Sequence, residues 1–594
     1  MRPAEEFREG LGEVRVKREQ RRPATVLPVD SENGAPISRR TCLVGAAALV
    51  GVGTALGSSV AGTRKPVGSN RSSVLVASRD NAVVSAVGGQ VRGYTRNGIY
   101  TFKGIPYAES TAAANRFMPP VKLKPWSGIR SCMAYGPVSP QPPRPRLDWQ
   151  NDEANFLVPQ DDGIQDEDCV RVNVWTPVLG ANAKLPVMVW LHGGRYSTGS
   201  GQNQRACDGE NLSRRGEVIV VSLNHRLGAL GFMDLSQFGE RYAASGNVGM
   251  LDIVAALEWV RDSIESFGGD PSRVTIFGHS GGAGKVAALM AMPGARGLFH
   301  RAIAQSGPIL RVREPQGAQR LAEETLNELE LDRARLMELQ YMPYSRIVAA
   351  GNKVISRYHG PIFSPDLSRL EDTVGWAPVN DGKTLLHPFD SEGLRISAHV
   401  PLLVGTTLNE MATNIGHPDG EGMTDAQLLA QVHEMVGERA AEVVAVFRER
   451  TPRAKPFDLW SRIASAPVRG VAIEQCKRKA ALGGAPTWLY WFTWQTPVLD
   501  GRPHAFHGAE LPFMFNNAER CETATGGGPD AIELAHLMSD TWAQFARTGD
   551  PNHAGLQKWP AFITERMPTM IFDSRSQAQE APDGKEQATM PPAR

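Results

Sequence analysis

Short runs of β-branched and other apolar residues alternate with amphipathic stretches along most of the chain. The runs at 184–194 (KLPVMVWLHGG) and 217–228 (EVIVVSLNHRLG) break at glycine, which is typical of buried parallel strands. Residues 247–271 carry apolar positions at helical spacing, and the β-rich run at 273–277 is followed by a second helical stretch at 281–292. The order strand, strand, helix, strand, helix predicts an α/β fold, with crossover helices between parallel strands.

Composition narrows the function classes. The 594 residues are 41% hydrophobic and 21% charged, and 64 basic residues against 63 acidic ones leave a net charge of +1. Because this charge supplies no strong field, nucleic acid and anionic membrane surfaces are not expected as partners. The last twenty residues are rich in glutamine, proline and charge, and they are expected to fray.

The N-terminal segment has the pattern of an export signal. Arg39 and Arg40 stand directly before an apolar stretch of small residues that ends in Ser59-Val60-Ala61. This pattern is similar to a twin-arginine signal with a small-x-small cleavage site. The alternative is an uncleaved membrane anchor, which the weak hydrophobicity of glycine and alanine disfavours.

The predicted organisation follows from that signal. Residues 1–61 form an N-terminal extension with the signal, and residues 62–594 form one large domain whose core runs from about 83 to 575. The mature protein is expected outside the cytoplasm, secreted or in the cell envelope, and to meet a membrane only in transit. Its oligomeric state is left open.

Cysteine usage gives no disulfide framework. Removing Cys42 with the signal leaves five cysteines, an odd number that cannot all pair within one chain. Those five are Cys132, Cys169, Cys207, Cys476 and Cys521. No Cys-x-x-Cys pair or histidine cluster occurs, so no metal site is expected.

One pentapeptide carries candidate chemistry. Gly278-His279-Ser280-Gly281-Gly282 fits G-x-S-x-G between a predicted strand and a predicted helix, the setting in which a tight turn exposes a nucleophilic serine. A serine hydroxyl needs an imidazole base and a carboxylate that orients it. Both should follow Ser280, but spacing does not choose among the later histidines, which are His300, His359, His387, His399, His417, His433, His504, His507, His536 and His553.

Motifs spread over almost the whole chain resemble the type-B carboxylesterase/lipase family, which includes cholinesterases. They occur in the family's order: FKGIPYAES (102–110), NRFMPP (115–120), EDCVRVNVWTP (167–177), NHRLGALGF (224–232), FGGDPSRVTIFGHSGG (267–282), RAIAQSG (301–307), FARTGDPN (545–552) and WPAF (559–562). The resemblance implies the α/β-hydrolase fold, a central, mostly parallel, twisted sheet with helices on both faces, in a single large domain.

The resemblance also implies the site. VGTTLNEMA (404–412) falls where the family carries its acidic residue, which makes Glu410 the orienting carboxylate. HAFHGAELPFMF (504–515) resembles the histidine segment, in which the base directly precedes a glycine, and this selects His507 over His504. The loop WLHGGRYSTGSG (190–201) resembles the oxyanion loop.

In that loop the family pattern implies backbone amides of Gly194 and Arg195, joined by that of Gly281, as oxyanion donors. Gly193 would let the loop turn.

Four departures from the family pattern stand out. Arg195 replaces a small residue, so its side chain must line the pocket or leave it. His279 replaces a glutamate that helps to hold quaternary ammonium esters in some members, which argues against a choline ester. Lys285 stands where a small residue is usual, and the sequence offers no account of it. Ser139 replaces a cysteine that pairs with the EDC cysteine, so Cys169 is either free or paired with Cys132.

The resulting prediction is a serine carboxylesterase that acts on a small-molecule ester through an acyl-enzyme on Ser280, without a cofactor. Two alternatives are a catalytically silent, adhesion-type binding protein, and an enzyme with another acyl preference, such as a long-chain lipase or a carbamate hydrolase. Sequence does not choose the acyl and alcohol specificity, because loops far apart along the chain shape both pockets.

Overall fold

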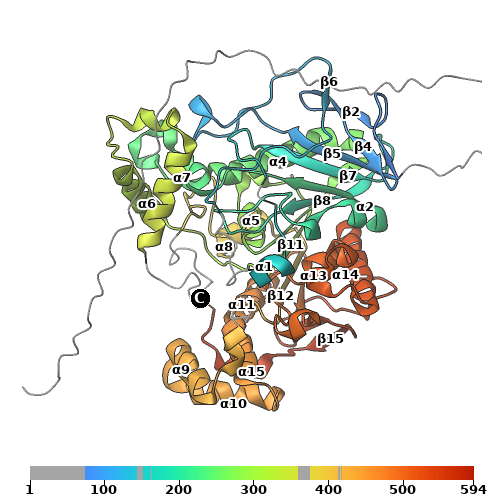
Figure 1. The fold of residues 1–594 in the computed structure, drawn as a ribbon, viewed down its shortest axis with the longest axis vertical. Coiled ribbons are helices and arrows are strands. Elements are labelled where there is room, and N and C mark those ends of the chain that lie inside the picture. The colour runs from blue at the N-terminus through green and yellow to red at the C-terminus, as the bar shows by residue number, and fades with distance from the viewer. Residues whose placement is uncertain are drawn as a thin grey trace, which may run out of the picture. The chain divides into compact units, whose positions relative to one another are not determined.

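A large twisted sheet forms the centre of the molecule (Figure 1). The computed structural model describes residues 74–143, 152–161, 163–358, 375–411, 415 and 418–593. The predicted twin-arginine signal lies outside these residues, and the predicted domain boundary at residue 62 stays a prediction. Within the described ranges, no helix has the length and apolar character that a membrane span requires.

In the described part of the chain the sheet has twelve strands, and its middle is parallel. From β9 through β8 and β10 to β14 every neighbouring pair is parallel, whereas the pairs at the β1 end and the pair β14·β15 are antiparallel. In spatial order the strands are β1 (Leu75–Val76), β4 (Tyr94–Arg96), β5 (Ile99–Pro106), β7 (Arg171–Thr176), β9 (Ile219–Leu223), β8 (Leu185–Leu191), β10 (Gly269–His279), β11 (Arg301–Gln305), β12 (Leu402–Thr407), β13 (Thr487–Phe492), β14 (Pro568–Phe572) and β15 (Gln577–Glu580). A separate small sheet holds β2 (Val83–Ala86), β3 (Gly89–Arg92) and β6 (Ile129–Ser131).

Helices cover both faces of this sheet. Val187, Val189 and Leu191 of β8 pack in one apolar cluster with residues of α4 (Val248–Ser263) and α5 (Gly281–Met290). Met188 and Trp190, which point the other way, belong to a second cluster with α14 (Pro529–Thr548). Because successive side chains of a strand point to opposite faces, one continuous apolar run serves both layers.

The strands and helices predicted from the hydrophobic pattern are present. The runs at 184–194 and 217–228 contain β8 and β9, and the helical stretches contain α4 and α5. The strand β13 is rich in aromatic residues, and all of its residues are buried. The α/β-hydrolase architecture is therefore confirmed.

The prediction for the last twenty residues is wrong. Residues 577–580 form β15 on the edge of the sheet, and residues 584–589 form the helix α15 (Gly584–Thr589). Met590 is buried in a third apolar cluster with residues of α9 (Asp425–Val436) and α10 (Ala440–Arg450). Composition misleads here because a few apolar contacts and a strand pairing suffice to order a polar segment.

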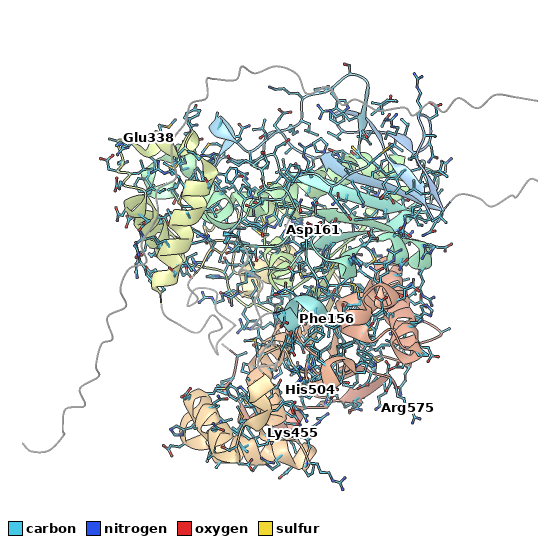
Figure 2. The ribbon with its side chains drawn as sticks, in the orientation of Figure 1. Phe156, Asp161, Glu338, Lys455, His504 and Arg575 are labelled. Carbon is cyan, nitrogen blue, oxygen red and sulfur yellow. The ribbon has the colours of Figure 1, made fainter. Side chains whose placement is uncertain are left out.

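The helical regions far from the middle of the sheet lie at different ends of the view. The helices α6 (Pro315–Glu328) and α7 (Tyr344–Arg357) lie on the left of the view. Glu338, labelled in Figure 2, belongs to the segment between them. The helices α9, α10 and α15 lie at the bottom, where Lys455 precedes α11 (Pro456–Ala481). The remaining short helices are α1 (Asp152–Leu157), α2 (Glu210–Gly216), α3 (Gly228–Phe232), α8 (Ser391–Ile396), α12 (Leu511–Met514) and α13 (Glu522–Thr525).

Candidate active site

Ser280 occupies a strained turn between β10 and α5. Its backbone has φ 56° and ψ −123°, and its amide donates to the carbonyl of Gln305 on β11 at 2.8 Å. Neighbouring glycines make the turn possible, because a Cβ on Gly282 would lie 2.0 Å from the Leu191 carbonyl oxygen. A Cβ on Gly307 would lie 1.9 Å from the Ser280 carbonyl oxygen. Strain of this kind persists only where the surrounding structure imposes it, and it presents the serine at the end of the strand.

The loop after β8 lies against this turn. A Cβ on Gly193 would be 3.5 Å from the Ser280 Cβ, and a Cβ on Gly281 would be 2.5 Å from the Arg195 backbone nitrogen. Gly194 and Arg195 both have positive φ, 85° and 56°. The loop thus brings the backbone of Gly193 to Arg195 beside Ser280 and the first turn of α5, where amides can converge on one point.

His507 and Glu410 form a direct hydrogen bond. The Nδ1 of His507 donates to the Oε2 of Glu410 at 2.6 Å, and the other oxygen of Glu410 accepts from the Thr407 amide at 2.7 Å. The Glu410 side chain is 1% exposed, whereas that of His507 is 40% exposed. The Thr407 amide and burial therefore fix the carboxylate, while the imidazole remains accessible.

The same carboxylate controls the protonation of His507. Desolvation lowers the pKa of His507, but the hydrogen bond and charge of Glu410, with a contribution from Glu510, raise it by more, and the Arg195 charge opposes them. The net shift is upward. The charge of Arg195 therefore acts on the imidazole.

Two loops hold this pair in place. Asn409 pairs with Phe506 in a parallel bridge, and its side-chain amide donates to the Ser461 hydroxyl at 2.9 Å. The Met411 amide donates to the Ser465 hydroxyl at 3.0 Å. Because both serines belong to α11, this helix positions the loop that follows β12 and carries Glu410.

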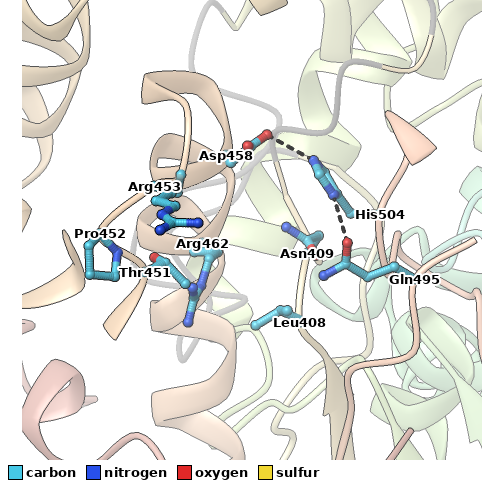
Figure 3. A pocket seen from close by; sticks show the side chains of 10 residues that line it. Leu408, Asn409, Thr451, Pro452, Arg453, Asp458, Arg462, Gln495 and His504 are labelled. Carbon is cyan, nitrogen blue, oxygen red and sulfur yellow. Dashed lines mark hydrogen bonds and ion pairs between the residues drawn. The ribbon is translucent and has the colours of Figure 1, made fainter. Parts of the chain in front are cut away.

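His504, the rejected neighbour of His507, faces a different pocket (Figure 3). Its Nε2 lies 3.0 Å from Asp458 Oδ1, and its Nδ1 lies 3.3 Å from Gln495 Oε1. The pocket has a volume of about 410 Å³, and its ten described lining residues include neither Ser280 nor His507. Of the two neighbours, His507 lies beside the serine turn, because its ring meets that of His279, the residue before Ser280, with centroids 4.4 Å apart.

His279 and Glu510 are two buried polar residues next to this ring contact. The Nε2 of His279 lies 3.9 Å from Glu510 Oε1, and Glu510 is fully buried with contacts at 3.4 Å to Gln305 and Ser306. Burial lowers the pKa of His279 well below its usual value, and the charge of His507 lowers it further. Burial and the charge of Glu410 raise the pKa of Glu510 to about 7.

Sequence reasoning missed Glu510. The available signal was a charged residue inside the apolar run AELPFMF, three residues after His507.

The cysteines of the described residues are unpaired. Cys132, Cys169, Cys207, Cys476 and Cys521 are all free in the structure, so no bond links Cys132 to Cys169. The hydroxyl of Ser139, in the place of the family's cysteine, instead accepts a hydrogen bond from the Leu227 amide at 3.0 Å. Among the described residues, no group of three or more histidine, cysteine, aspartate and glutamate side chains is arranged to hold a metal ion.

A strained serine between a parallel strand and a helix, with a hydrogen-bonded histidine and glutamate beside it, defines a serine hydrolase of the α/β-hydrolase class. The carboxylesterase family model matches residues 80–590, and the chain belongs to this family. It is similar to the para-nitrobenzyl esterase of Bacillus subtilis, with 34% identity over 86% of this chain and 99% of the relative. It is also similar to a phenmedipham hydrolase of Pseudarthrobacter oxydans, with 31% identity over 81% and 92%.

Solved structures agree with the fold. An esterase from Clostridium hathewayi, described as able to hydrolyse aliphatic aromatic polyesters, superposes with a TM-score of 0.72 and is 36% identical. That match covers 86% of this chain and 98% of the other. A Geobacillus stearothermophilus carboxylesterase gives a TM-score of 0.70 at 33% identity, over 86% and 100% of the two chains. The protein is a carboxylic ester hydrolase, and serine-based ester hydrolysis is the mechanism of its family.

Proposed function

We propose that Ser280, His507 and Glu410 are the catalytic residues of this carboxylesterase. The Ser280 hydroxyl attacks the ester carbonyl carbon while His507 Nε2 takes its proton, and Glu410 holds the ring and stabilises the imidazolium. His507 then protonates the leaving alcohol, which leaves an acyl group on Ser280. In the second half of the reaction His507 activates a water molecule, which attacks the acyl group, releases the acid and restores the serine.

Backbone amides stabilise the charge that develops on the carbonyl oxygen. The amides of Gly194, Arg195 and Gly281 are the proposed donors, each worth about 3 kcal/mol in such a site. Every step uses only side chains, backbone amides and water.

The observation that carries the assignment is the His507–Glu410 hydrogen bond at 2.6 Å, next to the strained turn of Ser280. The test is Ser280→Ala, assayed with a short-chain p-nitrophenyl ester and with a fluorophosphonate probe. The variant should fold normally, lose turnover and lose labelling. Undiminished turnover in a folded Ser280→Ala would refute the assignment.

A preference for short acyl or alcohol groups is part of the proposal. A cavity of about 90 Å³ includes Phe506 and Gly508, the residues on either side of His507, and its wall also holds the charged Arg205 and Glu522. A substrate group bound in so small a volume would be short. A p-nitrophenyl ester series from acetate to palmitate should show kcat/KM highest at short chains. An optimum at long chains, with activation above the micellar limit, would instead indicate a lipase.

Export through the twin-arginine pathway is proposed on the strength of Arg39 and Arg40 before a weakly apolar stretch. The double change Arg39→Lys and Arg40→Lys should retain esterase activity in the cytoplasm and remove it from the exported fraction. Unchanged export of the double variant would contradict the proposal.

A further inference from the structure

Lys285 is a lysine in an unusual place. It lies in α5, five residues after Ser280, and it is fully buried. Its Nζ donates to the carbonyl oxygen of His192 at 2.9 Å. A lysine is rarely fully buried, because removing its charge from water is unfavourable. A buried amine at this point therefore calls for a specific role.

The partner of Lys285 belongs to the loop beside the serine. His192 is the first residue after β8 and directly precedes Gly193, and its Nδ1 donates to the Gly193 carbonyl at 2.8 Å. Its ring stacks on that of His225, with centroids 5.2 Å apart. The lysine bond and the imidazole bond thus constrain successive peptide units just before Gly194 and Arg195.

The backbones on either side of this bond are closely packed. A Cβ on Gly282 would lie 2.0 Å from the Leu191 carbonyl oxygen and 3.0 Å from that of His192. The first turn of α5 therefore touches the chain that leads into the loop, and Lys285 ties the two together one turn further on. A rotation of the His192 peptide would move the amides that follow it.

The groups that face Lys285 bring little charge to its amine. They are the Tyr196 ring, whose centroid is 5.9 Å from Nζ, and the imidazoles of His192 and His225. Burial lowers the pKa of Lys285 to about 7. Burial and then the charge of Lys285 lower the pKa values of both histidines well below their usual range. The amine can donate to the carbonyl in either protonation state, because it keeps N–H groups in both.

A second buried lysine provides a matched comparison. Lys479 of α11 is also fully buried, and its Nζ donates to the carbonyl oxygens of Ser397 and Ala398, both at 2.9 Å. Burial lowers its pKa to about 8. The chain that it holds lies between α8 and β12, away from the loop of Gly193 to Arg195. It has the same chemistry as Lys285 and no contact with the site.

We propose that Lys285 is a positioning residue, which holds the His192 carbonyl so that the amides of Gly194 and Arg195 point at the oxyanion formed on attack by Ser280. The inference rests on the proposed catalytic role of Ser280. It gives Lys285 no contact with substrate. Its effect should therefore fall on the transition state and leave ground-state binding largely unchanged.

The experiment compares Lys285→Met with Lys479→Met, since methionine keeps the apolar stem and removes the donor. Lys285→Met should lower kcat by about 10²-fold with KM nearly unchanged, which is the size expected for a misplaced oxyanion donor. Affinity for an aryl trifluoromethyl ketone, which forms a tetrahedral adduct, should fall by a similar factor. Lys479→Met should lower the melting temperature and keep kcat within about twofold of the wild-type value.

The possible outcomes separate the two proposals. A wild-type enzyme that a fluorophosphonate does not label at Ser280 contradicts the catalytic assignment. Labelled wild type with a folded Lys285→Met of normal kcat and normal ketone affinity overturns the role of Lys285. So does an equal loss of kcat in both variants.

If Lys285→Met does not fold, Lys285→Gln, which retains an N–H donor of shorter reach, is measured in its place. It should show a smaller loss of kcat at unchanged KM, and a normal kcat with normal ketone affinity would again overturn the role.

Discussion

Two histidines three residues apart along the chain each pair with a carboxylate, and the two pairs differ in their surroundings. His507 binds Glu410, whose side chain is 1% exposed and which also accepts from the Thr407 amide. His504 lies beside Asp458, whose side chain is 29% exposed, and its second nitrogen faces Gln495. In the first pair the carboxylate is buried and hydrogen-bonded to a backbone amide, and the histidine ring is accessible. In the second pair the carboxylate is partly exposed, and both ring nitrogens of the histidine have side-chain partners.

The comparison shows that residue type does not make a catalytic pair. The partners of the carboxylate and the surroundings of the second ring nitrogen decide whether an imidazole can exchange protons with a substrate. The His507 ring contacts the ring of His279, the residue before Ser280, whereas His504 lines the pocket beside α11.

The largest difference between the pairs should appear on removal of the imidazole. His507→Gln is expected to lower kcat by about 10⁶-fold, because the serine loses its base. The matched change His504→Gln should leave kcat within a few-fold of the wild-type value. Steady-state hydrolysis of p-nitrophenyl butyrate measures both, and comparable losses in the two variants would break the distinction.

The carboxylates should differ by a smaller factor. Glu410→Gln keeps the shape but removes the charge that stabilises the imidazolium, and kcat should fall by about 10⁴-fold. Asp458→Asn, its counterpart, should change kcat by less than about threefold. The same ester assay applies, with circular dichroism as the control for folding.

The pH dependence should report only the first pair. Because the net effect of Glu410 is to raise the pKa of His507, the proton stays on the ring to higher pH. The acidic limb of kcat/KM should therefore have its midpoint above the ordinary histidine pKa, with activity increasing as pH rises through it. In Arg195→Gln the limb should move slightly further up, since the Arg195 charge lowers this pKa. A limb below the ordinary value would contradict this electrostatic description.

The smallest effect concerns stability at the second pair. Burial raises the pKa of Asp458, but the hydrogen bond and charge of His504 lower it by more, so the net shift is downward. A lowered folded-state pKa stabilises the fold above the unfolded-state value, and this contribution is lost as pH falls through the folded-state pKa. Asp458→Asn should lower the free energy of unfolding by about 0.5 kcal/mol near neutral pH and by less in acid. Urea denaturation near neutral pH and in acid measures this difference in the free energy of unfolding. A larger difference in acid than near neutral pH would contradict the downward shift of the Asp458 pKa.

Sequence alone predicted the regular parts of the molecule. The β-branched runs of β8 and β10 and the glycine-flanked turn at Ser280 have local causes, since the apolar pattern and the close approach of backbones act within a few residues. Choosing His507 over His504 required the family resemblance, because spacing along the chain does not choose among the histidines that follow Ser280.

Other features depend on contacts that no local pattern encodes. Glu510 and Lys285 are polar residues whose burial follows from how β8, β11 and α5 meet. The order in the last twenty residues likewise depends on apolar partners more than a hundred residues earlier, in α9 and α10.

The way the chain finishes has a practical consequence for anyone producing this protein. Met590 is buried in one apolar cluster with Leu428, Val432 and Val443. Trimming the chain after β15 would remove Met590 and expose apolar surface of that cluster to water, and the shortened product should aggregate. A purification tag is better joined through a spacer that follows the final residue than grafted in place of the tail.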